Sequence, residues 1–97
     1  MPSSLHSTHY QIFRSLLVAA REKSGLTQVQ IAESLGKPQS YISKYERGER
    51  RLDFTEFIEL ADVLKIDVND FVSSYQLGIS QVTTQKIRII KKNKLTN

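Results

Sequence analysis

The stretch that most constrains this fold is residues 25–52, GLTQVQIAESLGKPQSYISKYERGERRL, where two short helical patterns flank a single glycine, Gly36. Thr27 and Gln30 have the spacing of a capping box, which predicts the start of the first of these helices. Gly36 ends it, and Pro38 suits the first turn of the second because proline lacks an amide proton that this turn does not need. The inward positions are apolar: Ile31, Ala32 and Leu35 in the first helix, and Ile42 and Tyr45 in the second.

Three further helices are predicted from capping pairs and apolar periodicity. The first of these helices is expected to begin at Ser7 or Thr8, and the capping pairs are Thr8 with Gln11, Asp53 with Glu56, and Asp67 with Asp70. The apolar stripes are Tyr10, Phe13, Leu16, Leu17 and Ala20; then Phe54, Phe57, Leu60, Ala61 and Leu64; then Val68, Phe71, Val72 and Tyr75. No period-two pattern is sustained in residues 8–75, so we expect an all-α, five-helix domain there, after an N-terminal tail at residues 1–7.

Residues 76–97 form a basic C-terminal arm with five basic residues and no acid. Gly78 is expected to end the fifth helix. Residues 86–89 alternate as a strand would, although Val82, Ile89 and Ile90 could equally share a helical face. Three roles stay open: a solvated tail, a strand or helix for dimerisation or partner binding, and an arm that binds phosphates.

Composition excludes several classes of function. The chain of 97 residues has no cysteine, so disulfides and thiolate metal sites are excluded. Its two histidines, His6 and His9, lie near the N-terminus, and no catalytic set can be assembled around them. We expect no enzyme activity, no cofactor and no metal. No apolar run is long enough to span a membrane, and no signal peptide is evident, which predicts a soluble cytoplasmic protein.

The net charge of +4 is unevenly distributed. Residues 37–51 carry net +3, whereas residues 53–70 carry net −5. A polyanion would be attracted to one side of such a molecule and repelled by the other. Because two short helices joined by a tight turn can place one helix in a major groove, these features predict binding to double-stranded DNA.

Residues 25–64 resemble the Cro and phage-repressor type of helix-turn-helix, the XRE family, and the likeness extends over residues 10–72. The motifs that carry it are Leu-Thr-Gln at 26–28, Ala32 and Gly36 at the turn, Ile42-Ser43, and Glu46-x-Gly48. This resemblance implies a lambda-repressor-like fold and a recognition helix at residues 38–47.

The resemblance also implies residue roles. Base reading falls to Gln39, Ser40 and Lys44, with Tyr41 beside them. The chemistry agrees, because glutamine can pair with adenine and lysine can donate to guanine. Phosphate binding falls to Gln28, Ser43, Arg47, Arg50 and Arg51. Arg21 and Glu46 are implied to form a structural ion pair.

Two positions depart from the family pattern. Pro38 stands where a capping Ser or Thr is usual, which leaves Lys37 as the candidate cap of the recognition helix. Leu52 replaces a common proline.

Three functional hypotheses follow. The leading one is a transcriptional regulator, a repressor that binds a palindromic operator as a homodimer. The alternative is an antitoxin or other DNA-binding subunit whose C-terminal arm, from residue 77 onwards, binds a protein partner. The third is a protein-interaction module that keeps the fold without reading bases.

Overall fold

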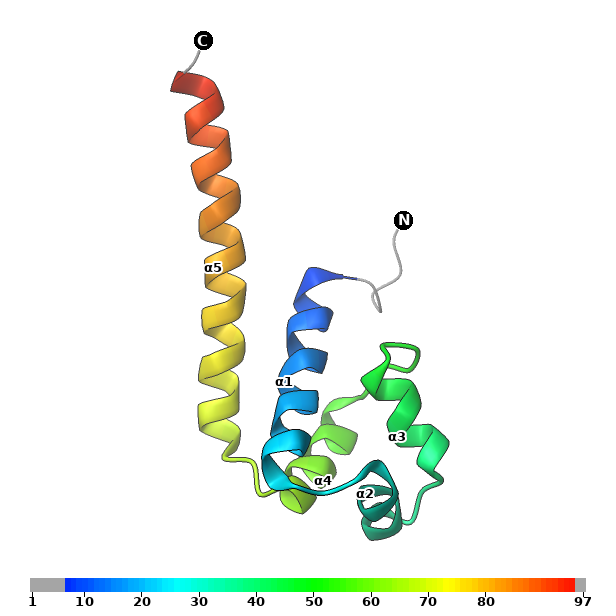
Figure 1. Cartoon of the computed structure of the whole chain (residues 1–97). Helices are drawn as coiled ribbons and strands as arrows, with labels where there is room; N and C mark the ends of the chain where they lie inside the picture. Colours follow the sequence, from blue (N-terminus) through cyan, green and yellow to red (C-terminus); the bar gives the residue numbers. More distant parts are fainter. Residues whose placement is uncertain (1–6, 96–97) are drawn as a thin grey trace.

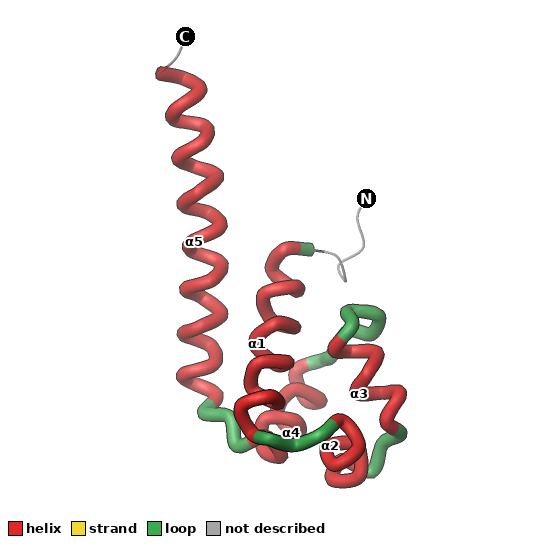
Figure 2. Tube along the Cα trace, viewed as in Figure 1, coloured by secondary structure: helices red, strands yellow, loops and turns green. Residues whose placement is uncertain are grey.

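The computed structural model describes the backbone of residues 7–95 and the side chains of residues 7–82. Five helices are joined by short loops, and the described residues contain no strand (Figures 1 and 2). The helices are α1 (Thr8–Ser24), α2 (Gln28–Leu35), α3 (Gln39–Glu46), α4 (Phe54–Leu64) and α5 (Val68–Leu95). The predicted all-α, five-helix fold is therefore confirmed.

Side-chain caps fix where the helices begin. In α2 the Gln30 amide donates to Thr27 Oγ1 over 3.1 Å, and the Thr27 amide donates to Gln30 Oε1 over 2.9 Å. This reciprocal pair is the predicted capping box. At α1 the cap is Ser7, whose hydroxyl accepts from the Tyr10 amide over 3.1 Å. The helix therefore begins at Thr8, one of the two predicted starts, whereas the capping pair predicted between Thr8 and Gln11 is wrong, because the N-cap is Ser7.

Asp53 and Glu56 form the capping box predicted for α4, with hydrogen bonds of 2.7 and 3.0 Å. Asp67 caps α5, since its carboxylate accepts from the Asp70 amide over 3.0 Å. The predicted starts of α4 and α5 are therefore confirmed.

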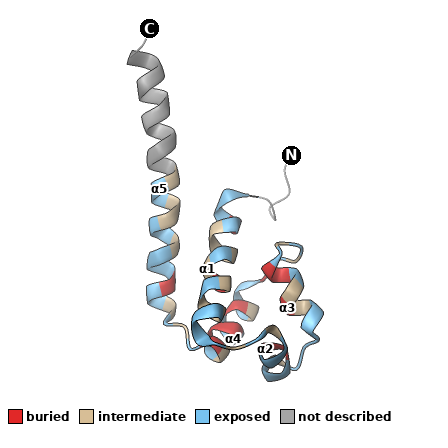
Figure 3. Ribbon diagram, in the orientation of Figure 1, coloured by how far each residue is buried: buried red, intermediate tan, exposed pale blue. Residues whose placement is uncertain are grey.

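The core lies where α1, α2, α3 and α4 meet, with the first turns of α5 closing one side (Figure 3). Its most buried side chains are Leu17, Ile31, Ile42, Tyr45 and Leu60. Three phenylalanines, Phe13, Phe57 and Phe71, pack with ring centroids 4.9 to 5.8 Å apart. Burial of these rings fixes α5 against α1 and α4.

Three residues expected in the core lie outside it: Phe54, Val72 and Tyr75, of which Tyr75 is half-buried. Phe54 is 74% exposed, because it is the first residue of α4 and the packed body begins one turn later, at Phe57. Val72 is 42% exposed, because it lies one residue past Phe71, about 100° around the helix from the packed face.

The fifth helix runs unbroken through Gly78, so the predicted end at this glycine is wrong. A Cβ at Gly78 would lie 3.0 Å from Ile12 Cγ2. The glycine therefore permits close approach of α5 to α1 instead of ending the helix. The backbone of residues 86–89 is helical, not a strand. Beyond α1, α5 continues as a single projecting helix (Figure 1). The side chains of residues 83–97, which include the charges of the basic arm, lie outside the described residues.

Candidate nucleic-acid interface

A tight turn sets the angle between α2 and α3. Gly36 adopts φ +67°, a left-handed conformation that favours glycine, and the Lys37 amide donates to the Ala32 carbonyl over 2.9 Å. The N-cap of α3 is Pro38, with an extended backbone and no side-chain capping bond. The expectation that Lys37 caps α3 and that Pro38 lies in its first turn is therefore wrong by one residue.

One edge of α3 faces solvent and the other enters the core. Gln39, Ser40 and Lys44 are exposed, whereas Ile42 and Tyr45 are buried. This division follows from the helical repeat, because the apolar positions return every three to four residues. The three polar side chains predicted to read bases thus share one accessible edge.

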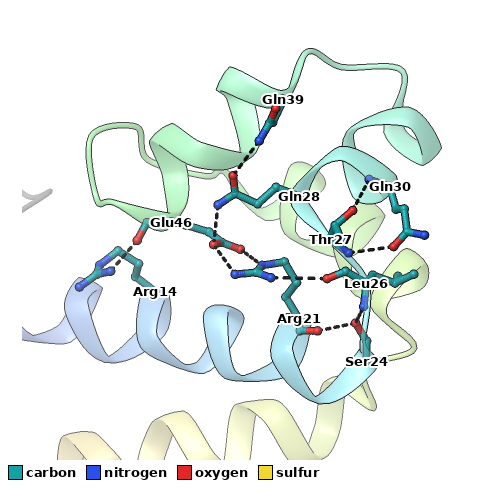
Figure 4. Close-up of polar contacts among 9 residues, drawn as sticks. All are labelled: Arg14, Arg21, Ser24, Leu26, Thr27, Gln28, Gln30, Gln39 and Glu46. Atoms are coloured by element: carbon teal, nitrogen blue, oxygen red, sulfur yellow. Dashed lines mark hydrogen bonds and ion pairs between the residues drawn. The ribbon is translucent and has the colours of Figure 1, made fainter.

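A chain of polar contacts connects this edge to the interior (Figure 4). Gln39 Nε2 lies 3.4 Å from Gln28 Oε1, and Gln28 Nε2 donates to Glu46 Oε1 over 3.0 Å. The Glu46 carboxylate, only 7% exposed, also accepts from Arg21 Nε at 2.5 Å and Nη2 at 3.1 Å. The Arg21–Glu46 pair expected from the resemblance is thus present, and its hydrogen bond raises the pKa of Arg21. Gln28 connects this pair to the first residue of α3.

Arg14, which the sequence analysis did not single out, belongs to the same region. Its Nη1 donates to the Glu46 backbone carbonyl over 2.5 Å, at the end of α3 (Figure 4). A positive charge is favourable at the C-terminus of a helix. Arg14 and Arg21 lie seven residues apart, two helical turns, and this spacing is the signal that could have identified Arg14.

Tyr41 lies at the junction of α3 and α4, not on the polar edge of α3. Its hydroxyl donates to Glu56 Oε2 over 3.0 Å, and the Arg50 guanidinium stacks 4.7 Å from its ring centroid. Arg50 also forms a 2.9 Å ion pair with Glu56. Burial, then the bond to Glu56, raises the pKa of Tyr41 to about 12. The Arg50 contact and the Asp53 amide lower the pKa of Glu56 to about 2.

The remaining predicted phosphate-binding residues surround the C-terminal end of α3. Arg47 hydrogen-bonds the Ser43 hydroxyl and pairs with Glu49, and both charged side chains of that pair are more than half exposed. Arg51 is exposed, with its guanidinium 5.3 Å from the Tyr10 ring centroid. Among the described residues, Arg51 has no acidic partner.

Tyr10 holds the loop that follows α3, a role that the sequence did not reveal. Its hydroxyl accepts from the Leu52 amide over 2.9 Å and donates to the Arg50 carbonyl over 3.4 Å. The leucine at position 52 is itself buried. Arg50 and Arg51 therefore extend from a loop that is anchored on α1.

Two short helices, α2 and α3, are joined by a tight turn at Gly36, and the polar side of α3 is exposed. This arrangement defines a helix-turn-helix protein. The helix-turn-helix family matches residues 17–71 of the chain. An XRE-family like protein from Pseudomonas syringae pv. tomato str. DC3000 is similar in structure, with a TM-score of 0.70 and 38% identity, over 76% of this chain and 90% of that chain. The protein therefore belongs to the XRE family of helix-turn-helix proteins.

A more distant likeness concerns the fold alone. The clp gene regulator ClgR from Corynebacterium glutamicum aligns with a TM-score of 0.67 and 18% identity, over 87% of this chain and 90% of that chain. No curated protein matches the sequence.

None of the described helices is both long and apolar enough to cross a membrane. Family and geometry together support a DNA-binding transcription regulator.

Proposed function

We propose that this protein is a sequence-specific transcription regulator that reads operator DNA through α3. The observation that carries the proposal is the exposed edge formed by Gln39, Ser40 and Lys44, on a helix whose opposite side is buried. Glutamine can pair bidentately with adenine, lysine can donate to guanine O6 and N7, and serine tolerates several bases. Each good base contact would contribute roughly 1 to 3 kcal/mol of discrimination.

Tyr41 takes a secondary part in this proposal. Its hydroxyl donates to Glu56 and the Arg50 guanidinium stacks on its ring. Only the edge of the ring is therefore free to contact a thymine methyl or a sugar. Its contribution to base preference is therefore smaller than that of Gln39 or Lys44.

Phosphate contacts would hold the register of the protein on the duplex without reading sequence. The proposed residues are Gln28, Ser43, Arg47, Arg50 and Arg51. Arg51 is best suited, since it is exposed and has no acidic partner among the described side chains. Arg50 must exchange its contact with Glu56 for a phosphate, so it would contribute less.

The proposed regulator acts as a homodimer and represses transcription from a palindromic operator. Two symmetry-related copies place two recognition helices on half-sites about one helical turn apart. A single module buries limited area on DNA, so linking two copies raises affinity and specificity together.

The test is a selection of bound duplexes from random oligonucleotides, done with the wild type and with Gln39→Ala and Lys44→Ala. We expect a palindromic consensus that changes at one position per half-site in each variant. Lys23→Ala, which removes an exposed lysine from the last turn of α1, is the matched control and should keep the wild-type consensus. Uniform weakening by Gln39→Ala, without a change of consensus, would show that Gln39 does not read bases.

The alternative, an antitoxin or another subunit of a protein complex, is favoured by one observation. The fifth helix, Val68–Leu95, projects beyond the body and offers a surface for a protein partner (Figure 1). Truncation after residue 82 separates the two functions. Loss of a co-purifying protein favours the subunit, whereas loss of operator affinity without such a protein favours the regulator. Absence of any salt dependence of DNA binding would instead favour a protein-interaction module, because phosphate contacts release counterions.

A further inference from the structure

A shallow apolar hollow lies between the start of α1, the loop after α3, the start of α4 and the first turns of α5. Its volume is about 480 Å³, and its floor includes the phenylalanine rings of Phe13, Phe57 and Phe71. No carboxylate lines it, and Arg51 is its only arginine or lysine. Aromatic rings that line a recess open to water form a surface on which an apolar partner can pack.

Phe54 stands on the rim of this hollow with 74% of its surface exposed. The ring lies outside the core of its own chain, because the packed positions of α4 begin at Phe57, and it contacts that core through the Phe57 ring, at a centroid distance of 6.4 Å. An aromatic side chain so exposed is costly in water and is typical of the buried centre of an interface. The same face therefore carries both a projecting ring and a recess lined by rings.

The apolar surface continues along α5. Val72, exposed, and Tyr75, half-buried, line the hollow, and Ile79, half-buried, follows at helical spacing. At about 100° per residue, these three positions fall within roughly 60° of one another on α5. They form a flank beside the face that packs on α1 through Gly78.

We propose that this surface, formed by Phe54, the hollow and the Val72–Tyr75–Ile79 flank, is where a second copy of the chain docks. A two-fold interface brings the same patch of both copies together, so it must be complementary to itself. A ring beside a recess meets that condition, because each Phe54 can enter the hollow of the other copy. The inference deepens the proposed function, since it names the surface that would form the dimer.

The area required explains why both parts are needed. A stable dimer buries about 800 Å² on each copy. One aromatic side chain supplies on the order of 150–250 Å². Phe54 therefore forms the centre of the proposed interface, and the hollow and the flank of α5 surround it. Arg51 also lines the hollow, which places this interface beside the proposed phosphate-binding loop.

The test is sedimentation velocity of the full chain without DNA, from about 1 to 100 µM. We expect the wild type to dimerise, and Phe54→Glu and Val72→Glu each to weaken the dimer by roughly tenfold or more, because each buries a charge at the interface. Leu77→Glu is the matched control. Leu77 is 60% exposed on α5, lies about 140° around the helix from Val72, and does not line the hollow. This variant should dimerise as the wild type does.

Phe54 is 74% and Val72 42% exposed, and neither belongs to the core, so circular dichroism and thermal melting should report folded monomers. A wild type that stays monomeric, a dimer that survives both substitutions, or equal weakening by Leu77→Glu would overturn the proposal. The same experiments distinguish failure of the proposed function from failure of the proposed interface. Dimers that depend on Phe54 but bind no operator would refute the regulator alone, whereas monomers that still select an operator would refute this interface alone.

Discussion

Replacing Arg21 with alanine would leave the buried carboxylate of Glu46 without its charged partner. Glu46 is 7% exposed and accepts two hydrogen bonds from Arg21, at 2.5 and 3.1 Å. Removing one member of a buried ion pair typically costs about 3–5 kcal/mol, because the remaining charge is neither hydrated nor paired.

Two features reduce that cost here. The Gln28 amide stays 3.0 Å from Glu46, and the Arg21 side chain is 20% exposed, so water can enter the vacated space. We therefore expect a loss of about 2–3 kcal/mol in the free energy of unfolding. A domain of this size loses about 4–8 °C per kcal/mol, which predicts a fall in Tm of roughly 8–24 °C.

Thermal melting by circular dichroism measures this effect, with two comparison variants. Arg47→Ala breaks the Arg47–Glu49 pair, whose side chains are 55% and 54% exposed, and should leave Tm unchanged. Arg21→Ala combined with Glu46→Gln removes the unpaired charge as well and should recover part of the loss. If Arg21→Ala has the same Tm as the wild type and as Arg47→Ala, the buried ion pair does not stabilise the fold as argued.

The remaining predictions concern the loop after α3 and its contacts with α4. Arg51→Ala should weaken binding to all DNA sequences alike and make the slope of log K against log salt shallower by about 0.9. Arg50→Ala should change this slope less, because Glu56 holds the Arg50 guanidinium. A filter-binding salt series with each variant measures this, and a larger effect of Arg50→Ala would contradict it. Glu56→Gln should lower the free energy of unfolding at pH 7. Because the pKa of Glu56 is lowered to about 2, its contribution is present above the ordinary pKa of glutamate and is lost as pH falls through about 2. Urea unfolding at several pH values should therefore find the two proteins converging in acid, and a constant difference would contradict this assignment.

The sequence predicted those parts of the fold that neighbouring residues determine. The reciprocal bonds of Thr27 and Gln30 arise within one helical turn, and the left-handed turn at Gly36 is a property of a single residue. Gly78 is different, because its role depends on Ile12, which lies more than sixty residues earlier in the chain. A glycine that ends a helix and one that admits a neighbouring helix look the same in a sequence.

The same distinction applies to the candidate site. Residues on the polar edge of α3 could be placed from the helical repeat, since exposure follows from the buried positions of the same helix. The placement of Tyr41 could not be predicted in this way, because its partner Glu56 belongs to α4 and the approach of α4 to α3 is a tertiary contact. Arg14 was missed for a similar reason, since its acceptor is a backbone carbonyl at the end of α3.

Helix α3, the proposed recognition helix, lacks a side-chain cap, yet its first side chain is held by other means. A cap at Pro38 would satisfy a backbone amide but would not orient Gln39. Gln28 does so directly, because its Oε1 accepts from Gln39 Nε2 while its own amide is held by Glu46. This contact uses one of the two protons on Gln39 Nε2 and leaves the second proton and the Oε1 acceptor available. An adenine edge in the major groove requires one donor and one acceptor from a glutamine. Bracing by Gln28 is therefore compatible with bidentate reading of adenine, and it reduces the side-chain entropy that Gln39 would lose on binding.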